Sequence, residues 1–568
     1  MVQVGIGEVT LSGHGEQDQK LFILGLDGAT LDLIEPWGAA GRLPNLTRLM
    51  AQGVYGELRS TIHPLTPQAW STMFTGKNAG KHGIYDFFQI SDGSYDLEFT
   101  NASHIRTRTL WSLLSAYGKR IAVVGVPFTY PPEPVSGVMI AGFEAPRADH
   151  TLTYPPQLFN EIVAATGKYR LHEGIPIGKK LDDYYHHLQL EINNRLDVIR
   201  YLWARGDWDF FMAVFHATDF VQHFFWHFMD PDHPLYDPAQ ARKYGDCILR
   251  VYQDIDRVVG EVDDLLDDQT NLVIVSDHGA GSLKKVINLN RWLYDMDLMA
   301  INEAGYSPRE KMLIKARDLM KRHLPRATKD WLKQRVPRVR SSFEALRQTT
   351  DIKWSETRAF SSGIFGNIYI NTVGRYPEGT VRPGGEYDSL CRRIIRELEN
   401  LRDPDTGAEI VERVYRREEL YSGPLVNKAP DLVIKWVDYE YYTSQDFRGG
   451  DDLFIPAMVQ EGSDFVQSGT HRLNGTFITK GPLWKQGHHL VGARIEDITP
   501  TVLYTLGLPV PSDIDGQVLV DGLLTEYVAN VPIRTSVEDG VVERADVGYS
   551  EQDALAVRER LRGLGYLE

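Results

Sequence analysis

Short apolar runs that end on a polar residue recur along the chain. Residues 21–26 lead into Asp27, residues 210–215 into His216, and residues 271–275 into Ser276 and Asp277. A continuous apolar run of this length is typical of a strand that is buried on both faces of a parallel sheet. Segments with helical spacing lie between these runs, at residues 43–52, 110–117 and 244–266. The alternation predicts an α/β fold with a mostly parallel central sheet and helices on both faces.

Acidic residues follow three of these predicted strands. Asp27 and Asp277 come directly after their strands, and Asp219 comes four residues after Phe215. In open α/β sheets, ligands bind in the crevice outside the carboxyl ends of the strands. Three carboxylates that converge there would repel one another unless cations lie between them. The sequence therefore predicts a cation site at this edge of the sheet.

The pattern also divides the chain into segments. Strands predicted at 366–370, 410–416 and 431–436, with a helix at 386–401, indicate a small α+β cap over the crevice. A strand at 476–479 and a helix at 498–506 then return to the character of the main sheet. We therefore predict a ragged N-terminus (1–20), the first part of the core (21–300), a basic helical insertion (301–360), the cap (361–464), the last part of the core (465–530) and a C-terminal tail (531–568).

The insertion is strongly basic. Residues 311–340 contain eleven Lys and Arg but only two acidic residues, Asp318 and Asp330. We interpret the segment as solvated helices that are broken at Pro325 and Pro337. The alternative is that residues 307–341 make a peripheral contact with an anionic membrane or a phosphorylated polymer.

Composition and charge exclude several classes of protein. The chain has 568 residues, of which 42% are hydrophobic, which is typical of a globular protein. Its net charge of −16 argues against binding to duplex nucleic acid. Cys247 and Cys391 cannot form a disulfide framework. The first twenty residues lack the features of a signal peptide, and the most apolar stretch, 210–229, contains His and Asp, so we expect a cytoplasmic protein without a transmembrane segment. The sequence leaves the oligomeric state open.

Histidines accompany the three acidic residues. Asp219 and His223 are one helical turn apart, a spacing that suits two ligands of one metal ion. His278 adjoins Asp277, and His471 stands in a Gly-Thr-His sequence much further along the chain. A set of Asp and His ligands without thiolates fits divalent zinc or manganese.

A threonine provides a candidate nucleophile. Thr66 precedes Pro67 at the start of a predicted helix, where it could be a simple N-cap. In the alternative interpretation, a hydroxyl at a helix N-terminus lies where a phosphoryl group would be held, and a metal ion beside it could activate that hydroxyl.

Taken together, these motifs resemble the alkaline phosphatase superfamily, and within it the branch of type I phosphodiesterases and nucleotide pyrophosphatases. The resemblance runs from about residue 20 to 520. It rests on the order of the motifs, which are Gly-Leu-Asp-Gly (25–28), Leu-Pro-Asn-Leu (43–46), Thr-Pro to Thr-Gly (66–76), His-Gly (82–83), Asp219 with His223, Ser-Asp-His-Gly (276–279), Gly-Thr-His (469–471) and Glu-Asp-Ile-Thr-Pro-Thr-Val-Leu (496–503).

The resemblance implies a three-layer, alkaline-phosphatase-like fold and two divalent metal ions, usually zinc. It places Asp219, His223 and His471 on one ion, and Asp27, Asp277, His278 and Thr66 on the other. Thr66 would attack the substrate and form a phospho-threonine intermediate, which water then hydrolyses.

The substrate is expected to be a small phosphate ester. Lys77, Asn78, Lys81 and Arg472 are candidate contacts to its phosphate oxygens. The alternative, which we favour for the first three, is a solvated loop, and the alternative for Arg472 is an ion pair with a nearby acid. Where diesterases of the family commonly carry an asparagine, residues 84–87 read Ile-Tyr-Asp-Phe. We expect a phosphodiesterase or nucleotide pyrophosphatase. The alternatives are a phosphomonoesterase or phosphomutase and, in another class, a metal-binding docking protein for anionic surfaces.

Overall fold

The computed structural model describes residues 19–171, 181–301, 352–444, 453–455, 458–459, 465–537, 540–545, 547–564 and 566. The basic segment 307–341, for which solvated helices or a membrane contact were considered, lies outside the described residues.

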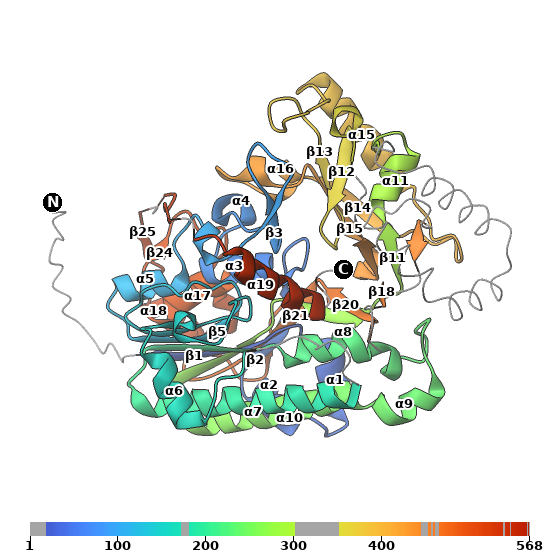
Figure 1. Ribbon diagram of the computed structural model, residues 1–568. Coiled ribbons are helices and arrows are strands. Elements are labelled where there is room, and N and C mark those ends of the chain that lie inside the picture. The colour runs from blue at the N-terminus through green and yellow to red at the C-terminus, as the bar shows by residue number, and fades with distance from the viewer. Residues whose placement is uncertain are drawn as a thin grey trace.

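A large sheet forms the centre of the molecule (Figure 1). Its strands follow the order β22-β2-β21-β9-β1-β8-β5-β6-β7, and the five strands from β9 to β6 are parallel. The prediction of a mostly parallel sheet is therefore confirmed. The strands in chain order are β1 (Lys20–Leu26), β2 (Val54–Arg59), β5 (Ile121–Val126), β6 (Gly137–Ala141), β7 (Thr153–Tyr154), β8 (Phe210–Phe215), β9 (Thr270–Val275), β21 (Asn474–Lys480) and β22 (His488–His489).

Helices cover both faces of this sheet. Figure 1 shows α2 (Pro44–Gln52), α7 (Leu181–Arg205) and α10 (Cys247–Leu265) below it. On the other face lie α3 (Thr66–Thr75), α5 (Leu110–Ala116) and α17 (Ile498–Thr505). Because both faces are covered, every residue of β8 and β9 is buried, which explains their continuous apolar runs. The predicted three-layer fold is confirmed.

The helix predicted at 244–266 is present as α10, Cys247–Leu265, and starts three residues later than expected. A separate short helix, α9 (Pro238–Tyr244), precedes it, and Gly245 and Asp246 lie between the two helices.

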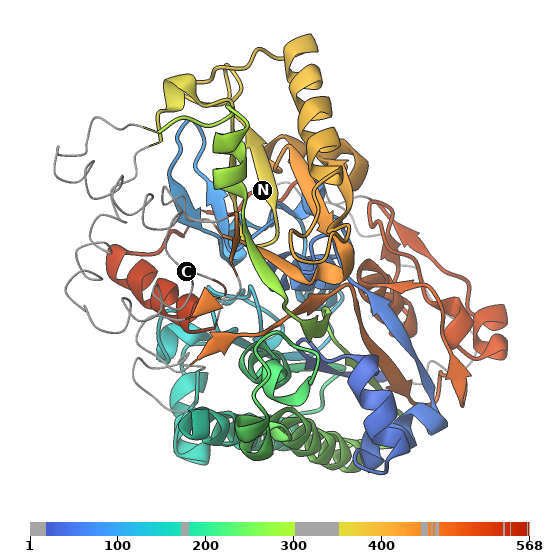
Figure 2. The same ribbon diagram turned by 90° about the vertical axis from the view of Figure 1, so that its right-hand side faces the viewer.

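A second, antiparallel sheet stands above the main one in Figures 1 and 2. It has the order β12-β13-β15-β14, and α15 (Gly385–Glu399) packs on β14. We call this unit the cap lobe. Its strands are β12 (Ala359–Ser362), β13 (Asn367–Ile370), β14 (Val411–Arg416) and β15 (Leu432–Trp436).

The C-terminal segment, residues 547–564 with Tyr566, packs against the core. Its helix α19 (Glu551–Gly563) buries Val557 and Leu561, and Leu564 behind it is buried as well. The side chain of Asn101 donates to the carbonyl of Val547 at 2.9 Å. The segment is therefore a docked part of the fold.

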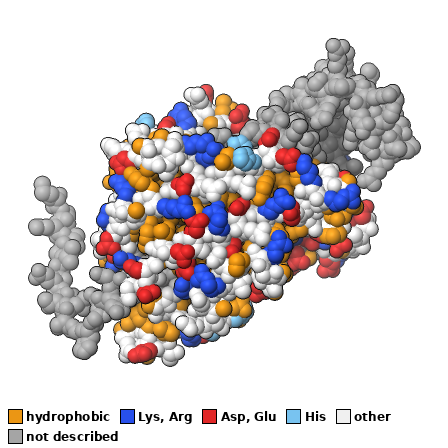
Figure 3. Space-filling model, turned by 90° about the horizontal axis from the view of Figure 1, so that it is seen from below, with side chains coloured by type: hydrophobic (Ala, Val, Ile, Leu, Met, Phe, Trp, Pro, Cys, Tyr) orange, Lys and Arg blue, Asp and Glu red, His pale blue; other side chains and the backbone are white. Residues whose placement is uncertain are grey.

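The face of the molecule that is seen from below is mixed in charge. Seen from below, basic and acidic side chains are interspersed over the face that Figure 3 shows. Within the described residues, no helix combines the length and the apolar character that crossing a bilayer requires.

The close packing of β1 against α3 gives a first prediction. A Cβ atom on Gly25 would lie 2.6 Å from the Trp70 ring and 2.7 Å from Val214. Gly25→Ala should lower the free energy of unfolding by about 1–3 kcal/mol, because both neighbours are held in the core. Urea denaturation measures this effect. Gly385→Ala is the control, since nothing lies within 4 Å of its Cβ position; equal stability of the two variants would contradict the prediction.

Candidate metal and catalytic centre

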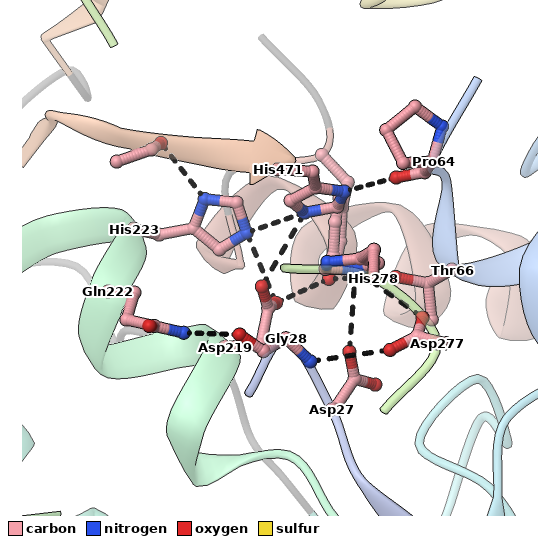
Figure 4. A network of polar contacts seen from close by, with 12 residues as sticks. Asp27, Gly28, Pro64, Thr66, Asp219, Gln222, His223, Asp277, His278 and His471 are labelled. Carbon is pink, nitrogen blue, oxygen red and sulfur yellow. Dashed lines mark hydrogen bonds and ion pairs between the residues drawn. The ribbon is translucent and has the colours of Figure 1, made fainter. Parts of the chain in front are cut away.

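Parallel strands bring the acidic residues and histidines to one edge of the sheet (Figure 4). Asp27 follows β1, and His278 follows β9 after Asp277. Because β8 leads directly into α8 (Ala217–Met229), Asp219 and His223 occupy the first two turns of that helix. His471 arrives on β20 (Gly469–Arg472), which pairs with β10 (Gly279–Ser282) next to His278. The six predicted ligands thus meet, although the chain brings them from distant segments.

The first group consists of Asp219, His223 and His471. The Nε2 atom of His223 lies 3.1 Å from an Asp219 carboxylate oxygen and 3.2 Å from Nε2 of His471. The Nδ1 atoms point away and contact backbone carbonyls, with His471 at 2.7 Å from the carbonyl of Pro64. A Nδ1–H that donates to a carbonyl leaves the Nε2 lone pair free, which is the tautomer that binds a metal.

The second group consists of Asp27, Asp277 and His278. Nε2 of His278 lies 3.4 Å from Asp277 and 3.6 Å from Asp27. Its Nδ1 atom lies 2.9 Å from the carbonyl of Gly279, so this histidine too presents Nε2 to the centre. Among the described residues, Oδ1 of Asp27 and Oδ2 of Asp277 are buried oxygens without a hydrogen-bond partner.

Electrostatics favour a cation at this place. Burial, followed by the charges of Asp277 and Asp219, raises the pKa of Asp27 well above its ordinary value. Burial also raises the pKa of Asp277. Burial opposes ionisation of Asp219 as well, but His223 and the other histidines outweigh it and hold its pKa below the usual range. A divalent cation relieves such repulsion between buried carboxylates, so the donor set fits divalent metal ions.

Thr66 lies next to these two groups, at the start of helix α3. It is the first residue of α3, whose N-cap is Leu65, and no side chain caps this helix. The interpretation of Thr66 as an N-cap is therefore wrong. Its Oγ1 atom points instead to Nε2 of His278, at 3.4 Å, and the residue is fully buried.

The structure does not bring Lys77, Asn78 and Lys81 to the centre. These residues follow α3, whose ten residues span about 15 Å, so they lie at the opposite end of the helix from Thr66. Lys77 is buried and pairs with Asp513, while Asn78 and Lys81 both bind the Asp515 carboxylate. They connect α3 to the loop around Asp515. The expectation that these three residues contact the substrate is therefore wrong.

Arg472 also points away from the centre. Neighbouring side chains of a strand lie on opposite faces, so Arg472 faces away from His471. It donates to the carbonyl of Ser282 at 2.8 Å and to that of Tyr439 at 3.3 Å. It lines a separate pocket of about 380 Å³, in which five acidic residues, Asp32 among them, outnumber the two basic ones, Lys435 and Arg472. This pocket does not suit an anion.

One residue of the centre was missed by the sequence analysis. The hydroxyl of Tyr566 lies 2.7 Å from Oδ2 of Asp219 and 3.3 Å from Oγ1 of Thr66. The helical spacing of Val557, Leu561 and Leu564 is the available signal, because it predicts a docked helix just before this tyrosine.

Comparison with known proteins gives the family of the chain. Residues 21–460 match the family model described as "Type I phosphodiesterase / nucleotide pyrophosphatase". The chain belongs to this family. The type I phosphodiesterase match includes Asp27, Thr66, Asp219 and Asp277 and ends before His471. Membership makes the chain an enzyme of the metal-dependent phosphoric ester hydrolases.

Several solved structures are similar to this chain, and the first named here shares its fold. Phosphonoacetate hydrolase from Sinorhizobium meliloti 1021, in complex with phosphonoacetate, is 15% identical with a TM-score of 0.52, and the match covers 86% of this chain and 95% of that one. Murine ectonucleotide pyrophosphatase / phosphodiesterase 5, an inactive form in complex with AMP, is 13% identical, covering 89% and 100% with a TM-score of 0.48. Its human counterpart is 14% identical, covering 89% and 100% with a TM-score of 0.47. No curated protein sequence matches this chain.

Proposed function

We propose that this member of the type I phosphodiesterase family hydrolyses phosphodiester or pyrophosphate bonds of small molecules through a phospho-threonine intermediate on Thr66. One observation carries the proposal: the buried Thr66 hydroxyl faces a set of three aspartates and three histidines that converge from four places in the chain. A nucleophile beside such ligands is the arrangement that phosphoryl transfer requires.

Two divalent ions, zinc or manganese, belong to the proposal. Asp219, His223 and His471 would hold one ion, and Asp27, Asp277, His278 and Thr66 would hold the other. When bound, the ions would lower the pKa of the Thr66 hydroxyl and neutralise charge on the phosphoryl oxygens.

The protein's own residues then act in two steps. Oγ1 of Thr66 attacks phosphorus, the bond from phosphorus to the leaving oxygen breaks, and that oxygen takes up a proton. Water next attacks the phosphorus, the bond to Oγ1 breaks, and Thr66 regains its hydroxyl. Throughout, the first turn of α3 presents backbone N–H groups without intrahelical acceptors, which favour the phosphoryl anion.

The position of the cap lobe favours a small substrate. His63, three residues before Thr66, contacts the Asn367 side chain at 3.2 Å and stacks on Phe365. The Phe365 ring also lies 5.4 Å from that of His471. Side chains of the cap lobe therefore reach the rim of the centre, where they limit the size of the ester that can enter.

The test is steady-state hydrolysis of a chromogenic phosphodiester and of the matching monoester, with zinc or manganese supplied. We expect turnover of the diester to exceed that of the monoester, and a chelator to abolish both. A monoester preference would contradict the diester assignment and indicate a phosphomonoesterase or phosphomutase. Turnover that survives complete chelation would contradict the metal-dependent mechanism.

A further inference from the structure

Tyr566 lies at the reacting atom of the proposed mechanism. Its hydroxyl is 3.3 Å from Oγ1 of Thr66 and 2.7 Å from Asp219, and only 1% of the residue is exposed. The phenol therefore borders both the nucleophile and one of the ligand groups. Nothing in the steps described above uses it.

The side chain is held firmly in this position. Its ring packs against Phe87 with ring centroids 4.7 Å apart. It also meets the His223 ring in an edge-on arrangement, with centroids 5.6 Å apart. Its backbone N–H donates to the carbonyl of Leu561 at 3.0 Å, which ties the residue to the last turn of α19. A hydroxyl positioned by packing and by backbone contacts loses little freedom when it binds a ligand.

The helix that carries Tyr566 is fixed as well. The guanidinium of Arg560 donates to the carbonyl of Phe143 at 2.9 Å and also to the carbonyl of Ala145. The hydroxyl of Tyr549 donates to the carbonyl of Glu144 at 3.2 Å. Three successive carbonyls of one loop, 143–145, thus anchor the C-terminal segment, and they set the place of the phenol relative to α3.

We propose that Tyr566 is a further catalytic residue, whose O–H donates to an oxygen of the phosphoryl group that is transferred to Thr66. The free oxygens of such a group are only two covalent bonds from Oγ1, so they come within hydrogen-bonding reach of a phenol that lies 3.3 Å from the same atom. The phenol carries one proton. It donates to Asp219 before the substrate arrives and turns to the phosphoryl oxygen as negative charge develops there.

The proposal rests on the proposed function, since it assumes that Thr66 is the nucleophile. A donor that is already aimed at the developing charge costs no reorganisation during the reaction. Removing one such donor from an enzyme typically lowers kcat by about 10²- to 10³-fold. A competing explanation is that Tyr566 merely occupies the place of the substrate and must leave before turnover, which predicts the opposite sign.

The experiment compares wild type with Tyr566→Phe, which removes only the hydroxyl. We expect kcat to fall about a hundredfold while KM and the two bound metals per chain stay unchanged. Orthovanadate resembles the transition state of phosphoryl transfer, so its affinity, measured by calorimetry on the metal-loaded protein, should fall by a similar factor. The matched control is Tyr527→Phe, which removes a hydroxyl that donates to the carbonyl of Tyr504 at 3.2 Å, outside the C-terminal segment and the centre, and which should leave kcat and vanadate binding as in wild type.

Two further variants separate the possible outcomes. Arg560→Ala loosens the anchor of α19 and should reproduce part of the loss in kcat. An unchanged or higher kcat in Tyr566→Phe, or tighter vanadate binding, would overturn the catalytic role; a higher kcat would identify the phenol as a substrate-competing occupant. Failure of the proposed function looks different, because turnover would then persist in Thr66→Ala whatever residue stands at position 566.

Discussion

Replacing Thr66 by alanine should lower diester turnover by roughly 10⁴- to 10⁶-fold, the range expected when a catalytic nucleophile is removed. The reason is that, in the proposed mechanism, Oγ1 of Thr66 is the atom that forms the new bond to phosphorus. The variant should still fold and bind both metal ions, because the six carboxylate and imidazole ligands remain. Initial rates, together with elemental analysis of the purified variant, measure the two effects.

Thr75→Ala provides the control for this experiment. Thr75 lies on the same helix, and its hydroxyl donates to the carbonyl of Ser71 at 2.6 Å, at the far end from the centre. We expect this change to affect stability but to keep most of the turnover. If Thr66→Ala retained a tenth or more of the wild-type rate, the assignment of the nucleophile would be wrong.

Replacing Asp219 or His471 by alanine should reduce the metal content from two ions to one per chain and lower turnover by at least about a hundredfold. Each change removes a ligand from the same group, in which the Nε2 atoms of His223 and His471 lie 3.2 Å apart. A site with only two protein ligands left binds a divalent ion weakly. Elemental analysis after dialysis measures the metal content directly.

His227→Gln is the matched control for metal loss. His227 is one turn further along α8 than His223, and its Nδ1 atom contacts the Ser468 hydroxyl at 2.8 Å. It contributes to neither ligand group, so this variant should keep both ions. Retention of both ions in Asp219→Ala and in His471→Ala would refute the ligand assignment.

The sequence predicts those parts of the molecule that depend on local pattern. β8 has the predicted bounds, and β1 differs by one residue, because burial on both faces requires a continuous apolar run. Asp27 and Asp277 could be placed at one edge because parallel strands end on the same side of a sheet. The fold class and the convergence of these side chains therefore follow from pattern and chain direction.

The remaining features depend on distances that pattern does not encode. Lys77 is close to Thr66 in sequence, yet the length of α3 separates them. Arg472 adjoins His471, yet strand alternation turns it to the other face. Tyr566 is 500 residues from Thr66, and only the docking of α19 against the loop 143–145 brings the two hydroxyls together. A contact of this kind has no local signature.

The position of β21 in the sheet has a consequence for folding during synthesis. β21, residues 474–480, lies between β2 and β9, and it is antiparallel to both. Until the ribosome has produced it, the nascent chain holds two strands whose facing edges have no partner, although nearly all of the other strands of the sheet are already present. Unpaired edges of this kind readily pair with other chains. We therefore expect fragments that stop before residue 474 to aggregate, and the full chain to benefit from a chaperone that holds the sheet open until its missing strand arrives.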